Sequence, residues 1–344
     1  MEGLLAEVKG LSAVKGRAVA GFLGALVADA AGQPLQWIYN DDTMSSAISA
    51  DPDKPEFISP SKNGFYKLPT GAQSNFGDQM MVTVRSLAHS KGLNIESYTA
   101  DFIKAFGEGS EYDKFAKLKS NPETKRPIEG PWSNGTMVRF VELQKEGKTA
   151  RDVTDDKLND PDIFPRGYPL LLVYAGKPTG DSVIRDFTTL MQSSEVSLGI
   201  MDAAYKLAEL YITNGEKEGE DNVKKLIDML NASPAENKFI LSILNEAHGS
   251  QSTSIKDATK NFGKGCSIPG SFQASLRAVL NDKGYTETVR EVIRSGGDIC
   301  SRLHTVGFCL GAKYGIDSIP RSWIDKTFAA EEGLRLALQI VKMS

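Results

Sequence analysis

Gly21-Phe22-Leu23-Gly24-Ala25-Leu26-Val27-Ala28-Asp29-Ala30-Ala31-Gly32 carries small or apolar side chains on almost every face. This pattern is typical of a helix that is buried on all sides. Glycines at positions 21 and 24 allow neighbouring helices to approach closely, so we expect residues 17–31 to form the innermost helix of a bundle. Gly32 is expected to end this helix, because Pro34 follows and cannot continue it.

Apolar residues recur at spacings of three and four along most of the remaining chain, as at Val196, Ile200, Ala203 and Leu207. This period is helical, so we expect an all-α fold, and without a flexible linker we expect a single domain over residues 1–344. Residues 168–174 fit either a helix or a buried strand. Two aperiodic stretches, 33–75 and 148–167, are expected to be ordered loops, and loops of that length are usually functional. The expected helices are 17–31, 79–90, 94–107, 135–146, 182–192, 195–213, 220–230, 236–248, 270–281, 285–295, 299–315 and 329–342.

The composition argues against several classes of partner. The 40 Lys and Arg are scattered among 44 Asp and Glu, with a formal net charge of −4, so nucleic acid is not an expected partner. The N-terminus lacks a basic signal-peptide region, and the apolar stretch 18–31 is shorter than the roughly 20 residues that cross a bilayer. The 3 cysteines show no CxxC spacing, which favours reduced thiols. We therefore expect a cytoplasmic protein with no membrane partner.

Two other segments place an aspartate after glycine at the start of a helical run. They are Gly77-Asp78-Gln79-Met80 and Gly296-Gly297-Asp298-Ile299-Cys300-Ser301-Arg302. In one interpretation each aspartate only caps the free N–H groups of its helix. In the other, both carboxylates converge on a hard divalent cation, and the helix N-termini receive a phosphorylated ligand. The residues alone leave both interpretations open.

Asp29 lies near the C-terminal end of an apolar helix, where the helix dipole disfavours negative charge. It therefore needs a specific partner, which is a loop N–H or an arginine in one interpretation and a substrate or metal-bound water in the other. Cys300 and His304 are four residues apart and could form a thiolate–imidazole pair, although a lone cysteine on an apolar helix is usually a packing residue. Asn134, before Gly135, is a competent helix N-cap.

In order and spacing, residues 21–34, Gly77-Asp78, Asn134-Gly135-Thr136 and Gly296-Gly297-Asp298 resemble the ADP-ribosylglycohydrolase family across nearly the whole chain. The resemblance implies an all-α, ADP-ribosylglycohydrolase-like orthogonal helical bundle. It also implies two magnesium ions between the loops and release of ADP-ribose from modified proteins or related conjugates. The site residues that it implies are Asp29 and Asp78 as catalytic residues, Asp78, Asp298 and Ser301 as metal ligands, and Gly77, Gln79, Asn134, Gly135, Gly296, Gly297 and Cys300 as ligand-binding residues.

The chain departs from the metal motifs of that family, which are Thr-Asp-Asp-Thr and Gly-Gly-Asp-Thr-Asp-Thr. Gln79 and Cys300 each stand where the motif has a carboxylate, which removes two formal charges. Magnesium prefers oxygen ligands in octahedral geometry, so an amide and a thiol are poor replacements. We expect one weakly held magnesium ion or none.

A narrower similarity, to the J-class crystallins of box-jellyfish eyes, is carried by residues 33–39, 77–79, 300–302, 311–320 and Trp323. Those crystallins are soluble lens proteins recruited from the hydrolase family. The similarity implies a structural protein of lens cytoplasm with little or no catalytic activity, for which self-association is possible. The alternative is a magnesium-dependent hydrolase or binder of ADP-ribose conjugates, with ADP-ribose or a related small molecule as partner. A thiol function at Cys300 is a third hypothesis.

Overall fold

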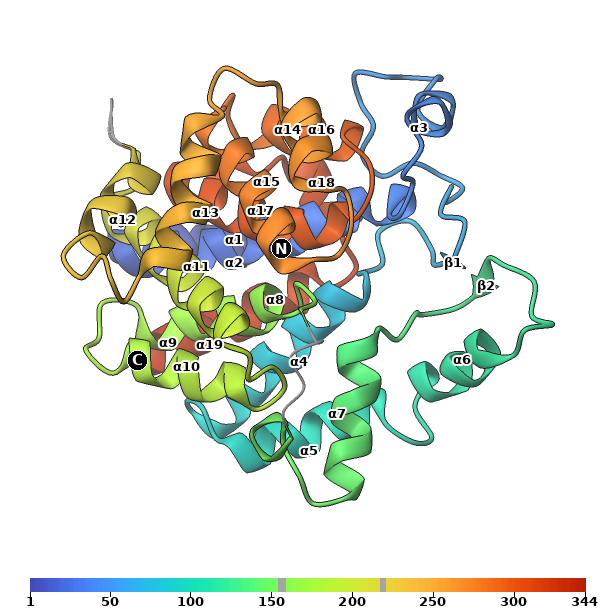
Figure 1. The fold of residues 1–344 in the computed structure, drawn as a ribbon, viewed down its shortest axis with the longest axis horizontal. Helices are drawn as coiled ribbons and strands as arrows, with labels where there is room; N and C mark the ends of the chain where they lie inside the picture. Colours follow the sequence, from blue (N-terminus) through green and yellow to red (C-terminus); the bar gives the residue numbers. More distant parts are fainter. Residues whose placement is uncertain (154–158, 217–220) are drawn as a thin grey trace.

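Two long helices pack against each other through the middle of the molecule. The computed structural model describes residues 1–153, 159–216 and 221–344, apart from the side chain of Lys119. Helix α2 (Ala13–Gly32) runs along α17 (Ile299–Tyr314), and the other helices surround this pair (Figure 1). A Cβ atom on Gly24 or Gly307 would collide with the backbone of the opposite helix. The small side chains of α2 therefore permit the close contact, and the prediction of an innermost helix is confirmed.

The other predicted helices are present, with ends that differ by a few residues; residue 220, the first of the predicted helix 220–230, lies outside the described residues. Their amphipathic faces pack onto the main apolar core that surrounds α2 and α17. They are α4 (Asn75–Ser90), α5 (Ile95–Phe106), α7 (Gly135–Lys145), α10 (Gly180–Thr189), α11 (Glu195–Asn214), α12 (Asn222–Leu230), α13 (Lys238–Gly249), α15 (Ile268–Leu280), α16 (Tyr285–Arg294) and α19 (Ala330–Met343).

Several short elements were not predicted. Residues 168–174 are helical, as η3 (Tyr168–Leu170) and α9 (Leu171–Tyr174), so the strand alternative was wrong. The two expected loops also contain short helices, although residues 154–158 of the second loop lie outside the described residues. The unpredicted elements include α1 (Glu2–Lys9), η1 (Gln33–Leu35), α3 (Asp41–Ala47), α6 (Glu111–Ser120), η2 (Ala150–Asp152), α8 (Ile163–Gly167), α14 (Ile255–Phe262), η4 (Ile316–Ser318) and α18 (Arg321–Lys326).

The end of α2 differs from the prediction. Gly32 has a φ of −88°, so it is not a left-handed stop, and the chain continues into η1. A Cβ atom on Gly32 would collide with Leu303 and Ile299, so close packing is the reason for a glycine here. Within the described residues, Ala13–Leu35 is long and apolar enough to span a membrane. The expectation that this stretch is too short was therefore wrong. The 18-residue apolar window within it is wholly buried inside the fold, which identifies a core helix.

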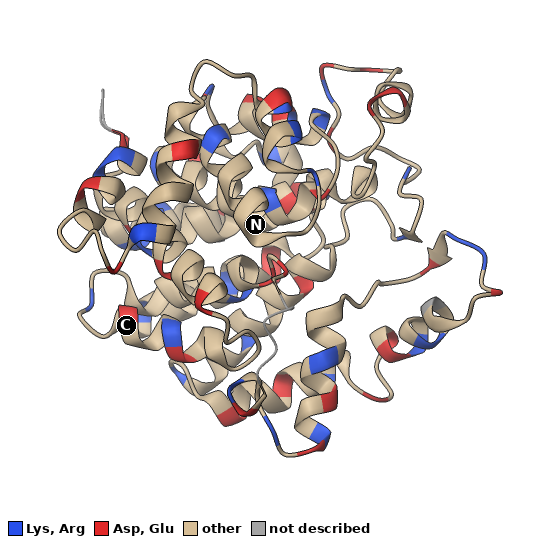
Figure 2. Cartoon of the chain, in the orientation of Figure 1, with Lys and Arg blue, Asp and Glu red and all other residues tan. Residues whose placement is uncertain are grey.

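The described part of the chain contains one small sheet, in which β1 (Tyr66–Lys67) and β2 (Ile128–Glu129) run parallel. A single antiparallel bridge also joins Ile38 to Gly297, which places the loop after η1 beside the start of α17. The strand β2 and helix α6 stand away from the bundle (Figure 1). Basic and acidic residues alternate along the ribbon without a continuous stripe of either sign (Figure 2).

Candidate functional site

Asp29 lies completely buried where the end of α2 meets the start of α4. The backbone N–H of Ser74 donates to its Oδ2 (2.8 Å) and the Ser74 hydroxyl to its Oδ1 (2.5 Å). The same hydroxyl caps α4 by accepting a hydrogen bond from the N–H of Phe76 (3.1 Å). Gly77 is required beside this carboxylate, because a Cβ atom there would collide with Asp29 Oδ2. The partner of Asp29 is thus a loop N–H and a hydroxyl.

Asp78 does not cap its helix, contrary to the capping interpretation. Because α4 begins at Asn75, behind the N-cap Ser74, Asp78 lies inside the first turn. Its Oδ2 accepts a hydrogen bond from the hydroxyl of Tyr112 (2.7 Å), which belongs to α6. Asp78 is therefore positioned by a distant tyrosine.

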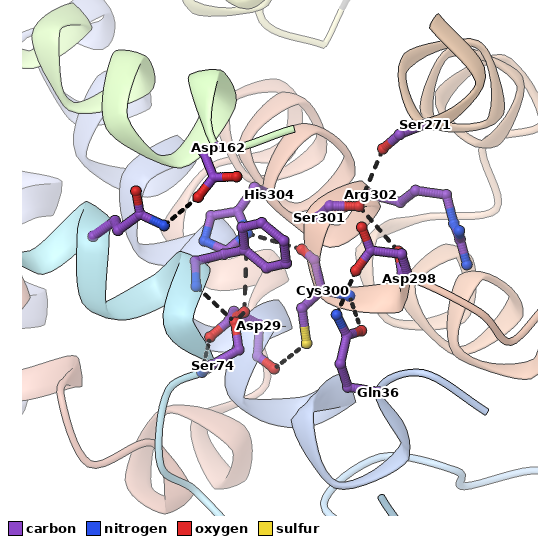
Figure 3. A network of polar contacts seen from close by, with 12 residues as sticks. Asp29, Gln36, Ser74, Asp162, Ser271, Asp298, Cys300, Ser301, Arg302 and His304 are labelled. Atoms are coloured by element: carbon purple, nitrogen blue, oxygen red, sulfur yellow. Dashed lines mark hydrogen bonds and ion pairs between the residues drawn. The ribbon is translucent and has the colours of Figure 1, made fainter. Parts of the chain in front are cut away.

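Asp298 occupies the N-cap position of α17, but its carboxylate does not cap the helix. Its Oδ1 accepts hydrogen bonds from the side-chain nitrogens of Gln36 and Trp37, the latter at 3.1 Å. The side-chain oxygen of Gln36 instead accepts from the N–H of Cys300 (2.8 Å) and so caps α17 (Figure 3). Gln36 and Trp37 were missed from the sequence because they lie 262 and 261 residues away from Asp298.

The diglycine before Asp298 makes this arrangement possible. Gly296 and Gly297 have φ values of 70° and 73°, which favour glycine. A Cβ atom on either residue would also collide with a carbonyl oxygen of a neighbouring loop. Ser301, predicted as a metal ligand, donates its hydroxyl to the carbonyl of Asp298 (3.0 Å) and contacts Ser271 (3.1 Å).

Two acids that the sequence analysis missed complete this group. Asp162 is fully buried before α8, and its Oδ1 accepts hydrogen bonds from the amide nitrogens of Gln79 (2.5 Å) and Asn134 (2.5 Å). Asp160 accepts from the hydroxyl of Thr136 (2.9 Å). Both acids lie in the expected loop 148–167, whose length was the one available signal. We refer to Asp29, Asp78, Asp160, Asp162 and Asp298 as the acid cluster.

Comparison with known proteins identifies the family and the fold. The ADP-ribosylglycohydrolase family matches residues 11–344. The chain belongs to the ADP-ribosylglycohydrolase family. It is 31% identical to Crystallin J1A of Tripedalia cystophora over 96% of this chain and 97% of the relative. The identity to Crystallin J1B of the same organism is also 31%, over 96% of this chain and 98% of the relative.

A solved structure supports the same assignment of the fold. It is described as an ADP-ribosylglycohydrolase-related protein complex, with a TM-score of 0.67 over 97% of this chain and 100% of that chain. Its sequence identity is 18%, so the likeness concerns the fold alone. The predicted family and its all-α class are therefore confirmed.

The predicted site residues of this family member converge, but they differ in access. Asp29, Gln79, Asp298, Cys300 and Ser301 have no exposed surface. Asp78, Asn134 and Asp160 are half-buried, and Gly135 is exposed at the start of α7. The N-cap role predicted for Asn134 is confirmed, because its side-chain oxygen accepts from the N–H of Met137 (3.0 Å). The side of α7 and Asp160 is therefore the part of this group that is open to solvent.

Burial raises the pKa of several of these carboxyls. The pKa of Asp29 rises to about 7, although its hydrogen bonds to Ser74 lower it, and those of Asp78 and Asp162 rise to about 6. Burial also raises the pKa of Asp298, against the hydrogen bond from Ser301 and the charge of Arg302. Carboxyls that exchange protons near neutral pH are the groups that general acid–base catalysis requires.

Cys300 and His304 do not form the thiolate–imidazole pair considered above. The thiol of Cys300 contacts the carbonyl oxygen of Asp29 (3.7 Å), whereas His304 Nδ1 bonds to the backbone carbonyl of Cys300 (2.8 Å). Burial raises the pKa of Cys300 well above its usual value and lowers that of His304 to about 4. At neutral pH this geometry holds a neutral thiol and a neutral imidazole.

The residues present fit a two-magnesium site poorly. In residues 1–153, 159–216 and 221–344, no three His, Cys, Asp or Glu side chains come together in an arrangement that could hold a metal ion. One oxygen each of Asp162 and Asp298 is buried without a described partner, as a cation ligand would be. However, Gln79 directs its amide nitrogen, not an oxygen, to Asp162, and the Asp78 oxygen Oδ2 accepts from Tyr112. The carboxylates that the family motifs place at positions 79 and 300 are thus missing, although oxygens of Gln79, Asp162 and Asp298 remain buried without a described partner.

Proposed function

We propose that this ADP-ribosylglycohydrolase homologue is a structural eye-lens crystallin, located in lens cytoplasm, whose inherited metal site is degraded and has little or no catalytic activity. The two crystallin relatives cover almost the whole chain and support the structural role. The observation that carries the proposal is that uncharged donors of the chain itself bind the acid cluster. These donors include Ser74, Tyr112, Gln79 and Gln36.

Hydrogen bonds from uncharged side chains reduce the need of the acid cluster for a compensating cation. A buried carboxylate without a partner is costly, and a metal ion is one way to compensate it. Here an amide or hydroxyl hydrogen bond lies on four of the acids that would otherwise need a cation, namely Asp29, Asp78, Asp162 and Asp298. We infer that the fold is stable without magnesium, as a long-lived structural protein requires.

Calorimetric titration of the purified protein with ADP-ribose, with and without magnesium chloride, tests this proposal. The expected result is no binding heat in either condition. Magnesium-dependent heat that disappears in Asp78→Ala and Asp298→Ala would overturn the proposal and establish a live site. Gln79→Asp combined with Cys300→Asp is the matched positive variant, because it restores both carboxylates and should raise the affinity for magnesium.

The alternative is a magnesium-dependent hydrolase or binder of ADP-ribose conjugates. Two observations favour it: the buried oxygens of Asp162 and Asp298 without a described partner, and the pKa of about 7 for Asp29. If magnesium were bound, it would supply a polarised oxygen for attack on the anomeric carbon. Asp29 would then hold or release a proton near neutral pH, and Ser74 would orient it. Release of ADP-ribose from a modified protein by the wild type, lost in Asp29→Asn, would support this alternative.

The structural role also has a direct test in tissue. A crystallin is a major soluble component of the lens, so quantitative proteomics of dissected eyes should find this chain among the most abundant proteins. Light scattering of the purified protein at rising concentration should show no precipitation, with any self-association limited to small oligomers. A trace amount in the lens, or abundance in other tissues alone, would contradict the structural role.

A further inference from the structure

Residues 107–130, which carry α6 and β2 and which we call the lid, have their own small apolar contact. A buried cluster separate from the main core contains Tyr66, Ile128 and Trp132, with Phe115 of α6 packed against it. Among the described lid residues, Tyr112 alone belongs to the main core, where its ring packs on Phe106 (4.8 Å). The lid can therefore leave the bundle without opening a large cavity in the main core.

The lid is tied to the rest of the molecule mainly at the loop of β1, and by exposed ion pairs of Glu129 with Lys67 (3.7 Å) and of Glu108 with Lys145 (3.5 Å). Its backbone is bound to the loop of β1 by hydrogen bonds from Ile128 N–H to Phe65 (3.0 Å) and from Gly130 N–H to Lys67 (3.1 Å). The guanidinium of Arg126 lies over the rings of Phe65 (5.5 Å) and Trp132 (5.2 Å). Arg126 is exposed, and an exposed cation–π contact is weak.

The lid also contacts the acid cluster. Tyr112 donates its hydroxyl to Asp78 (2.7 Å). Two residues beyond the lid, Trp132 lies under Arg126 of the lid (5.2 Å) and packs edge-on against Trp37 (5.6 Å), whose ring nitrogen donates to Asp298 (3.1 Å). Closure of the lid is therefore coupled to two of the acids, one directly and one through Trp37.

Both ends of the lid contain glycines with backbone conformations that favour glycine. Gly109 has a φ of 84° and no atom within 4 Å of the position of a Cβ atom. Gly130 has a φ of 142°, and a Cβ atom there would overlap the ring of Phe115. Hinges are a few loop positions that absorb large changes of backbone angle, and these two glycines meet that requirement.

We propose that the lid opens as a unit about Gly109 and Gly130 while the main core stays folded, and that Arg126 latches it closed over the acid cluster. Opening removes the Tyr112 hydroxyl from Asp78 and admits water to the cluster. This inference does not depend on whether the site binds ADP-ribose, because a crystallin with a relict site would have the same lid.

Hydrogen exchange followed by NMR or mass spectrometry tests the proposal on the intact protein. In the wild type, the amides of Ile128 and Gly130 should exchange at least about tenfold faster than the buried amides of α4, as local opening predicts. Arg126→Ala should increase the hydrogen-exchange rate of the lid amides by a further factor of about three and leave the exchange rate of the α4 amides unchanged. Arg185→Ala, which removes an exposed arginine paired with Asp202 on α11, is the matched control and should alter neither.

A reversible lock supplies the second measurement. Lys67 and Glu129 are aligned partners in the β1–β2 register, so Lys67→Cys with Glu129→Cys should allow a disulfide across the lid contact. Oxidation should slow exchange at Ile128 and Gly130 to the rate of α4, and reduction should reverse this. The proposal is overturned if the lid amides of the wild type exchange no faster than those of α4, or if oxidised and reduced forms exchange alike.

Discussion

Replacing Asp29 by asparagine should stabilise the protein at pH 8 and have little effect at pH 4. Burial raises the pKa of Asp29 from 3.8 to about 7, so the folded protein binds more protons than the unfolded chain between these values. Stability is therefore greatest below the unfolded pKa and falls as the pH rises towards 7. At about 1.36 kcal/mol for each pH unit, the loss is about 4 kcal/mol, which is an upper bound if water reaches the ionised group.

Asparagine suits the position because it resembles the protonated acid. Its oxygen can accept from the Ser74 N–H and its amide nitrogen can donate to the Ser74 hydroxyl, which replaces both present hydrogen bonds. The neutral side chain also removes the repulsion between Asp29 and Asp78. The variant should thus gain about 4 kcal/mol relative to the wild type between pH 4 and pH 8.

Urea denaturation of both proteins from pH 4 to pH 8 measures this difference. Asp78 and Asp162 titrate in the same pH range in both proteins. The quantity to compare is therefore the difference in the free energy of unfolding between variant and wild type at each pH, and not the pH dependence of either protein alone. Asp53→Asn, at an exposed position, is the control and should shift stability little at any pH. An Asp29→Asn variant that is equally destabilised at pH 4 and pH 8 would refute the reasoning, because it would mean that Ser74 holds an ionised carboxylate.

Three other predictions concern the packing of α2 against α17, the hydrogen bonds of Gln36 and the burial of the cysteines. Gly24→Val should destabilise the protein by at least about 3 kcal/mol in thermal or urea unfolding, because its side chain would meet the backbone of α17, whereas Gly249→Ala, with open space around it, should have little effect. Gln36→Ala should lower the free energy of unfolding by about 2–3 kcal/mol, because it removes both a donor to buried Asp298 and the acceptor for Cys300 N–H. A decrease below about 0.5 kcal/mol would contradict this role. Iodoacetamide should modify Cys266 in the native protein before Cys300 or Cys309, because Cys266 alone of the three is exposed, and mass spectrometry of peptides would reveal early labelling at Cys300 that contradicts the burial of the site.

The long helices were predictable because their information is local. Apolar residues on all faces predict a buried helix such as α2, and a 3.6-residue period of apolar residues predicts an amphipathic helix. Short helices such as α3 and α6 contain too few apolar residues to show a period. Gly296 and Gly297 were singled out in the sequence as ligand-binding residues, and the structure shows that their left-handed backbone favours glycine. Gly32 was assigned the wrong reason, since its contacts come from α17.

The partners within the site were not predictable, because they are set by contacts between distant residues. Gln79 and Asp162 are 83 residues apart in the chain, and no spacing rule joins an amide to a carboxylate over that distance. The capping interpretation of Asp78 failed for a local reason. Ser74 is the better N-cap and lies four residues earlier, so the true helix start was present in the sequence but was overlooked.

Retention of the acids does not by itself indicate activity, because each has a structural task in this fold. Asp29 ties α2 to the N-terminus of α4 through Ser74, and Asp298 ties the loop of Gln36 to α17. Replacing either by alanine would leave buried donors without partners, which costs about 1–3 kcal/mol for each group. A protein that never bound magnesium would therefore still need a hydrogen-bonding side chain at both positions, although at position 29 asparagine would serve this structural task as well as aspartate.

The informative positions are instead Gln79 and Cys300, where a carboxylate is expected from the family motifs and is absent. If the glutamine at position 79 only removes a metal ligand, restoring aspartate there would leave the stability of the metal-free protein unchanged. If Gln79 has become a donor to Asp162, the same change places two carboxylates together in a buried position, and the protein should lose stability at pH 8 and recover it when magnesium is added. Thermal unfolding of Gln79→Asp with and without magnesium chloride distinguishes these cases, because only a rebuilt site couples metal binding to folding.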